Sequence, residues 1–337
     1  MNDLLSARMG GQCGTFTTAD ANACGHDSLS LSRLLKSGDI VRVGPRAYVD
    51  GRLHRRSTPQ QQHALAARSI VRSFDGRSAA SHYSALALMN LPIFGASLST
   101  THVVRAAGQQ SRRRGTLAVH RTYGPDALCT VGGTLSVVPA LAVIGTAMAC
   151  GIESGVVAAD AALSRAKTTP EELALWIERL SGRPMLVRAR QAVRIADARS
   201  ESPGESRTRV ILTGLGYTEV ETQTRVTDGR RVVARVDLMV RGVLVVEFDG
   251  AVKYEGAQGR EALVAEKKRE DLLTAGLRDK TTQLLPTRAC AGRVVSRMGD
   301  NRVAHVTCGG ARCLTTKITT HRTTLITTPL PRPTGAC

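Results

Sequence analysis

Acidic residues gather in one segment of the chain, between two short runs of alternating apolar residues. The runs VVARVDLMV (232–240) and VLVVEF (243–248) flank Arg241-Gly242 and predict a β-hairpin. Side chains alternate between the two faces of a strand, so the turn decides which acids share a face. A two-residue turn would place Asp237 opposite Val246, on the other face from Glu247. A three-residue turn at 240–242 places Asp237, Glu247 and Asp249 on one face, and we prefer it because it alone separates apolar from polar groups.

Two of these carboxylates could share one divalent cation. In the preferred register Asp237 and Glu247 are diagonal neighbours, with backbones about 7–8 Å apart. Mg²⁺ takes oxygen ligands and is usually held by one or two carboxylates together with phosphate oxygens, and Mn²⁺ is the alternative. Such an ion can supply hydroxide and stabilise the leaving oxygen of a phosphodiester. The alternative interpretation is a solvated strand face on which these acids alternate with Arg235.

The flanking sequence predicts the elements that would hold this hairpin. Ser202-Pro203-Gly204-Glu205 begins a helix over 205–216, 217–226 is a strand, and 260–276 is a helix. This order, with the motifs SPGESRTR, VARVDL, VVEFDG and AEKKRED, resembles the PD-(D/E)xK nuclease superfamily. Within it, the segment 201–276 is similar to very-short-patch-repair-like endonuclease domains with an α-β-β-β-α core.

The resemblance implies a set of catalytic groups, with the metal held by the two hairpin acids. Asp249 stands where the superfamily has its lysine, so a lysine from another position would supply the positive charge. The set is Glu205, Asp237, Glu247, Asp249, Lys253 and Lys267. Glu205 has a structural alternative, because Ser-x-x-Glu with proline at the first helical position is also a capping box.

The N-terminal residues predict a second functional module. Short helices over 16–24, capped by Thr17 or Thr18, and over 28–36 precede a β-ribbon over 40–50 with its tip at Gly44-Pro45. We expect the second helix to bury Leu29, Leu34 and Leu35. This is the order of a winged helix-turn-helix, and the segment resembles the N-terminal domain of AbiEi-type antitoxins. Arg46 stands where that family often has glycine.

In a winged helix, the second helix of the helix-turn-helix enters the DNA groove and the wing reaches the phosphates. We therefore predict groove contacts from the helix and phosphate contacts from the ribbon. The predicted DNA-binding residues are Ser30, Ser32, Arg33, Lys36, Arg42 and Arg46. Many winged helices bind proteins instead, and that alternative stays open.

The middle region, 58–200, predicts a mixed α/β domain without a catalytic motif. We expect helices over 59–73, 78–90, 139–162 and 170–180, strands over 100–105 and 116–121, and a basic loop at GQQSRRRG. His82, His102 and His120 have no acid or cysteine partner at ligand spacing, so we predict that they are isolated structural residues.

The last segment, 277–337, is a basic region rich in Thr, Arg and Cys. Its abrupt change in composition predicts either a disordered tail or a chain read out of its ancestral frame. It offers no core strand to follow the last nuclease helix, so we expect an unpaired sheet edge there. Cys308, Cys313, His305 and His321 only loosely match a zinc pattern, because they lack a clean CxxC pair.

Composition limits the remaining possibilities. A net charge of +18 favours polyanions as partners, with nucleic acid first. The eight dispersed cysteines and the absence of a signal peptide or membrane-length apolar run predict a reduced, cytoplasmic protein that does not enter membranes.

These observations predict an α+β protein with four regions: 1–57, 58–200, 201–276 and 277–337. We expect it to bind DNA and to cut it with a Mg²⁺- or Mn²⁺-dependent endonuclease-like domain, in a defence or toxin–antitoxin setting. The alternative is a non-catalytic, antitoxin-like regulator with a degenerate nuclease fold. A toxin-like protein is the second partner that the resemblance implies.

Overall fold

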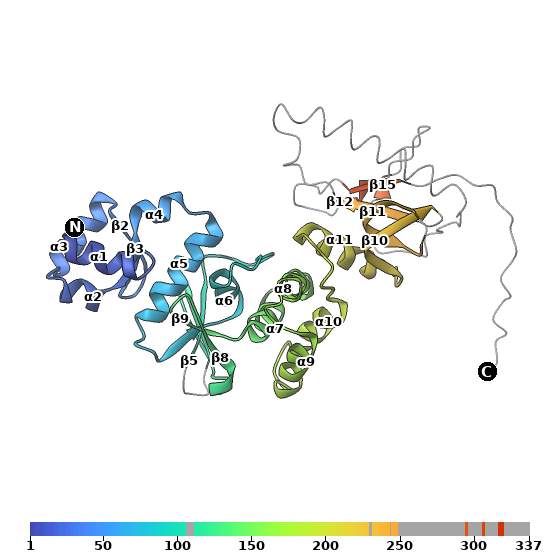
Figure 1. Ribbon diagram of the computed structural model, residues 1–337. Helices are drawn as coiled ribbons and strands as arrows, with labels where there is room; N and C mark the ends of the chain where they lie inside the picture. The colour runs from blue at the N-terminus through green and yellow to red at the C-terminus, as the bar shows by residue number, and fades with distance from the viewer. Residues whose placement is uncertain are drawn as a thin grey trace, which may run out of the picture. The chain divides into compact units, whose positions relative to one another are not determined.

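The structure is a computed structural model that describes residues 1–105, 111–228, 231–242, 244–248, 294–295, 305–306 and 316–319 (Figure 1). It divides into two units, Met1–Val210 and Ile211–Cys337. Helices and several sheets are both present, which confirms the α+β class. Among the described residues, no helix combines the length and the apolar character needed to cross a membrane.

The first unit begins with a winged helix-turn-helix. Three helices surround a small antiparallel sheet in the order β1-β3-β2. Phe16 and Tyr48 stack at its centre with ring centroids 5.2 Å apart, and Leu5, Leu31 and Leu34 pack around them. The elements are α1 (Asp3–Gly11), β1 (Thr15–Thr17), α2 (Thr18–Ala23), α3 (Ser28–Ser37), β2 (Ile40–Gly44) and β3 (Ala47–Asp50).

The helix expected over 16–24 is shorter than predicted. Phe16 belongs to β1, where it pairs with Tyr48 and is fully buried, so the helix starts after it. Thr17 is the cap, and its side chain and that of Asp20 form a reciprocal capping box. The first helix and β1 were not predicted, because α1 has only Leu5 and Met9 as buried residues and β1 spans three residues.

A mixed six-stranded sheet forms the middle of the first unit, in the order β6-β7-β5-β4-β9-β8. Helices α5 and α6 pack on it, α7 packs against α6, and α8, α9 and α10 pack with α7 (Figure 1). The strands are β4 (Ser78–Ala80), β5 (Thr101–Arg105), β6 (Arg112–Arg114), β7 (Leu117–His120), β8 (Leu128–Val131) and β9 (Thr134–Val137). The helices are α4 (Gly51–Arg56), α5 (Pro59–Arg72), α6 (His82–Leu88), η1 (Pro125–Ala127), α7 (Pro139–Cys150), α8 (Ile152–Ser164), α9 (Pro170–Arg179) and α10 (Leu186–Ile195).

Three predictions for this region were wrong in detail. The segment 78–90 is not one helix, because 78–80 form the strand β4 between β5 and β9 before α6 begins. The segment 139–162 is two helices, separated at Gly151, whose φ of +105° interrupts α-helical geometry. Arg112–Arg114 lie in β6 rather than in a loop. The predicted helix at 59–73 and the strands near 100–105 and 116–121 are confirmed.

Helix α11 (Pro203–Gly214) is joined to the first unit by a buried ion pair. Arg209 Nη2 donates to the Asp160 carboxylate of α8, and these side chains are 5% and 1% exposed. Arg209 Nη1 also donates to the Ile195 carbonyl oxygen at the end of α10. The pair therefore joins three helices at one buried point.

The second unit contains a four-stranded sheet in the order β10-β11-β12-β15. Its buried apolar residues form two clusters, one of which joins the end of α11 to the sheet through Leu212, Leu238 and Val246. The strands are β10 (Val220–Asp228), β11 (Arg231–Val240), β12 (Leu244–Phe248) and β15 (Thr316–Thr319), and a separate pair joins β13 (Val294–Val295) and β14 (His305–Val306).

The hairpin has a three-residue turn, as expected, but the turn lies one residue further along. Val240 pairs with Leu244, so the turn is 241–243 rather than 240–242. Leu238 lies opposite Val246, whereas the predicted turn would place it opposite Leu244. A shift of two residues keeps every side chain on its predicted face of the sheet. The expected open sheet edge was wrong, because β12 pairs with β15, with Glu247 opposite Lys317.

Removing one partner of the buried ion pair tests this description of the first unit. We expect Arg209→Met to lower the free energy of unfolding by about 3–5 kcal/mol, because Asp160 would be left as a buried uncompensated charge. Urea unfolding followed by the fluorescence of Trp176, the chain's single tryptophan, measures it.

The matched control breaks an exposed ion pair instead. Asp126→Asn removes the partner of Arg179, where both side chains are about half exposed, and should change the stability by no more than about 1 kcal/mol. Equal effects of the two substitutions would contradict the assignment of the buried pair as a structural anchor.

Candidate nucleic-acid interface

Helix α3 is fixed at both ends by local interactions. At its start the Asp27 carboxylate accepts the Ser30 amide at 2.8 Å, and these hydrogen bonds lower the pKa of Asp27. At its end Gly38 adopts a left-handed conformation with a φ of +74°. The Arg55 guanidinium of α4 also donates to the Gly38 carbonyl oxygen at 2.7 Å. The helix is therefore held firmly while one of its faces stays exposed.

The exposed face of α3 is a stripe of four residues at helical spacing. Leu31 and Leu34 are buried, while Leu29, Ser32, Arg33 and Lys36 are exposed at the i, i+3, i+4 and i+7 positions. The stripe offers two cations, a hydroxyl and an apolar side chain to a partner. These are the group types that contact phosphates, base edges and thymine methyl groups in DNA.

Two expectations for α3 were wrong. Leu29 was placed on the buried face, but it is 58% exposed, and Leu31 occupies the core position instead. Ser30 was placed on the exposed face, but it is half-buried and its hydroxyl donates to the Asp27 carbonyl oxygen at 2.9 Å. Ser32, Arg33 and Lys36 are exposed, as their predicted role requires, and the role itself stays a prediction.

The β2–β3 ribbon presents the two predicted wing arginines. Arg42 and Arg46 are both exposed, and Arg46 lies in the turn with a φ of +58°. Glycine suits this conformation better than arginine does. The chain therefore holds a cation at the wing tip where the backbone geometry favours a residue without a side chain.

A hollow of about 800 Å³ joins the helix-turn-helix to the wing. Ser32 of α3 and Arg42 of β2 both line it, together with the turn between α2 and α3. Two of the predicted DNA contacts therefore open onto one concave surface. A concave surface with a cation at its edge is suitable for a phosphate backbone.

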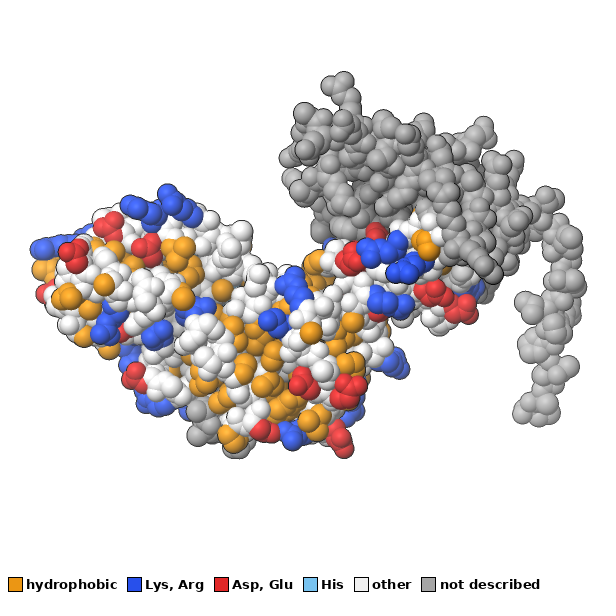
Figure 2. Space-filling view, viewed as in Figure 1, with side chains coloured by type: hydrophobic (Ala, Val, Ile, Leu, Met, Phe, Trp, Pro, Cys, Tyr) orange, Lys and Arg blue, Asp and Glu red, His pale blue; other side chains and the backbone are white. Residues whose placement is uncertain are grey.

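Basic side chains that the sequence analysis did not consider gather over α4 (Figure 2). Arg52, Arg55 and Arg56 are exposed on this helix. The signal for them was the run RLHRR, directly after the ribbon. By contrast, the carboxylates of Asp20, Asp27 and Asp50 accept backbone hydrogen bonds at the starts of helices.

The acids predicted for the nuclease site fall into different parts of the structure. Glu205 lies at the start of α11, where its carboxylate accepts the Ser202 hydroxyl at 2.7 Å and the Glu201 amide at 2.9 Å. The Glu205 amide in turn donates to the Ser202 hydroxyl at 3.2 Å. These interactions form the capping box that was the alternative interpretation of Glu205. A role for Glu205 beside a metal ion stays a prediction.

The two hairpin acids lie next to paired residues in the observed register. Asp237 precedes Leu238 and Glu247 follows Val246, so the two acids are the next residues along their strands beyond the last observed pair. Asp237 is half-buried, and Gln223 donates to it at 3.4 Å. Asp249, Lys253, Lys267 and the helix expected over 260–276 lie outside the described residues, as do Cys308, Cys313 and His321.

The three middle-region histidines are not isolated, which corrects the prediction. His82, His102 and His120 come from α6, β5 and β7, and their potential ligand atoms lie within 4.8 Å of one another. His102 Nδ1 and His120 Nε2 are 2.9 Å apart and share a hydrogen bond. Sequence analysis could not reveal this cluster, because the three residues are far apart in the chain.

Comparison with known families supports the reading of the N-terminal module. A family model described as "Transcriptional regulator, AbiEi antitoxin" matches residues 3–49. The match runs from the first residue of α1 to within one residue of the end of β3, and so covers the winged helix-turn-helix. No curated protein matches the chain.

The cap of α3 makes a prediction about pH. The folded state lowers the pKa of Asp27, so the cap contributes stability above its ordinary pKa near 3.8 and loses it as the pH falls through the lower folded value. Asp27→Asn keeps a good cap but does not titrate. We expect wild-type α3 to be protected from hydrogen exchange at least as well as the variant at about pH 6.

The protection of wild-type α3 relative to the Asp27→Asn variant should decrease as the pH falls below about 4, where the wild-type carboxyl group becomes protonated. Mass spectrometry of the peptide that contains α3, compared between the two proteins at each pH, measures the difference. A difference that grows with acidity would contradict the capping role of the charged form.

Proposed function

We propose that the winged helix binds duplex DNA and that the protein acts as a transcriptional regulator in a toxin–antitoxin setting. The exposed stripe of α3 carries the proposal, because it combines Arg33 and Lys36 with Ser32 and an exposed leucine on a helix fixed at both ends. The family match to residues 3–49 supports the regulatory setting. A toxin-like protein is the second partner that we propose on the same basis.

The proposed geometry assigns different tasks to the helix and to the wing. The α3 stripe enters the major groove, where Arg33 and Lys36 read base edges and Leu29 contacts a thymine methyl group. Arg42 and Arg46 bind phosphates from the wing, and the α4 arginines extend the same electrostatic contact. The net charge of +18 favours association with DNA through release of condensed counterions.

Binding to duplexes selected from a random-sequence pool tests this proposal. We expect Arg33→Ala and Lys36→Ala each to weaken binding by about 1–3 kcal/mol on the selected sequence, because base contacts are lost. Arg42→Ala should instead weaken binding to all sequences and reduce the slope of log K against log salt by about 1. Fluorescence anisotropy at several salt concentrations measures both quantities.

Arg190→Ala is the matched control, because it removes the same charge from an exposed position on α10. It should leave the affinity and the salt slope nearly unchanged. The proposal is wrong if Arg190→Ala and Arg33→Ala have equal effects, or if the full-length protein selects no duplex.

A second candidate function is metal-dependent cleavage of DNA by the second unit. The observation that favours it is the hairpin register, in which Leu238 pairs with Val246, so that Asp237 and Glu247 are the next residues along the two strands. We propose that these two acids hold Mg²⁺ or Mn²⁺. Two carboxylates are a suitable ligand set for a hard divalent cation.

Nicking of supercoiled plasmid tests this second function. We expect nicking that requires Mg²⁺ or Mn²⁺ and that falls at least about a hundredfold in Asp237→Asn, since the variant loses one anionic ligand while keeping an oxygen acceptor for Gln223. Glu221→Gln is the control, because it removes an exposed acid from the neighbouring strand β10. Plasmid binding without metal-dependent nicking would support the non-catalytic regulator.

A further inference from the structure

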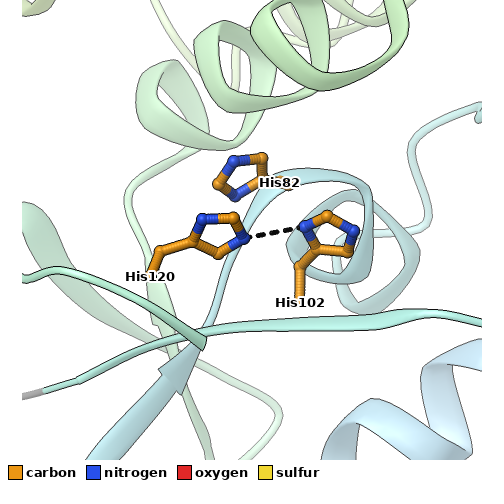
Figure 3. A group of neighbouring side chains, drawn as sticks. All are labelled: His82, His102 and His120. Atoms are coloured by element: carbon orange, nitrogen blue, oxygen red, sulfur yellow. Dashed lines mark hydrogen bonds between the residues drawn. The ribbon is translucent and has the colours of Figure 1, made fainter. Parts of the chain in front are cut away.

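The histidine cluster lies inside the middle domain, away from the exposed face of α3. His102 stands on β5 and His120 on β7, and these neighbouring parallel strands place both rings on one face, because His120 lies opposite Val104. His82 reaches the same place from the start of α6, and Figure 3 shows the three rings gathered there. Three separate elements therefore deliver one imidazole each to a single point.

The spacing of the rings suits a single metal ion. Zinc binds histidine nitrogens at about 2.0–2.1 Å in tetrahedral geometry, which sets ligand nitrogens about 3.4 Å apart. The hydrogen-bonded pair His102 Nδ1 and His120 Nε2 is at 2.9 Å, and all three ligand atoms lie within 4.8 Å. The ring centroid of His82 is 4.9 Å from that of His102 and 4.0 Å from that of His120. Small ring rotations would bring the three nitrogens to ligand distances.

The chemical state of the rings also suits a metal. Burial is the largest cause that lowers the pKa of all three rings; together with nearby charges, among them Arg113 for His102 and Arg183 for His120, it brings the pKa to about 3 for His102 and about 4 for His120. The rings are therefore neutral at physiological pH, which is the form that binds metals. No net proton has to be released, but the proton shared between His102 Nδ1 and His120 Nε2 has to move to the other nitrogen of its ring before both atoms can bind an ion.

The backbone around His82 is adapted to this ring. His82 has a φ of +51°, an uncommon conformation for a residue with a side chain. Its ring lies against Gly145 of α7, where an added Cβ would come within 3.0 Å of the ring. Glycine inside a helix costs stability, so the fold accepts two local costs to hold this imidazole beside the other two.

We propose that His82, His102 and His120 bind one zinc ion, with a water molecule in the fourth position. Imidazole is a preferred ligand of zinc, and three histidines with an open fourth position are an established zinc arrangement in proteins. Arg183 acts electrostatically on His82 and His120, so its charge favours a hydroxide or another anion over neutral water at the fourth position. This proposal is independent of DNA binding.

Metal content of the full-length protein tests the proposal. Protein stripped with a chelator, reloaded with Zn²⁺ and passed through gel filtration should retain one zinc ion per chain. The parent for all variants is Cys308→Ser/Cys313→Ser, which removes the candidate thiol ligands of the C-terminal region. We expect His102→Asn and His120→Asn each to weaken zinc binding by at least about a hundredfold in competition with a chromophoric chelator.

His63→Asn is the matched control. His63 is a buried histidine of the same domain, but its ring nitrogens are engaged with the Leu98 carbonyl oxygen and the Ser84 hydroxyl, both at 2.8 Å. Its loss should leave zinc affinity within about threefold of the parent, provided that circular dichroism shows all proteins folded.

Cobalt keeps the proposal testable if the variants fail to fold. Co²⁺ loaded into the Cys308→Ser/Cys313→Ser parent should give the visible absorption of a tetrahedral site with nitrogen and oxygen ligands, without the thiolate charge-transfer bands of a cysteine site. Any of three results would overturn the proposal: no retained zinc, equal zinc affinity in folded His102→Asn and the parent, or a thiolate spectrum.

Discussion

The first unit depends on helix α5, which packs against two sheets, the small sheet of the winged helix and the six-stranded sheet. The buried Ser69 hydroxyl lies between the carbonyl oxygens of Phe16 and Tyr48, at 3.1 and 3.0 Å, and so joins α5 to the strands β1 and β3 of the winged helix. Ile70 and Val71 of the same helix pack in the core of the six-stranded sheet. Because one helix is shared, the winged helix is a fixed extension of the middle domain within this unit. The exposed stripe of α3 therefore belongs to a module that is fixed to the middle domain.

Local sequence signals were enough to predict those elements whose structure depends mainly on their own residues. The ribbon β2–β3 was predicted from alternation, and the helix α5 was predicted without knowledge of its cap at Thr58. Leu29 was misplaced because α3 has four leucines and only tertiary packing decides which of them face the core. The hairpin turn was misplaced by one residue because alternation fixes the faces of two strands but several registers keep the same faces.

The sites differ in how much the sequence could reveal. The cations of α3 and of the wing follow from helical and strand spacing within one short segment, and their exposure was predictable. The histidine cluster was not, because His82, His102 and His120 meet only through the parallel pairing of β5 with β7 and the position of α6 above them. Glu205 shows a third case, in which one motif fits both a helix cap and a catalytic acid. The observed cap accounts for the motif without a metal ion.

Hydrogen exchange of the full-length protein, with and without a selected DNA duplex, tests the central claim most directly. If α3 and the wing form the DNA-binding surface, the peptides covering 28–37 and 40–50 will gain protection on the duplex. The Arg33→Ala variant will lose that protection at the same DNA concentration. Protection confined to the basic strand β6 or to the second unit, with residues 28–50 unchanged, would contradict the account.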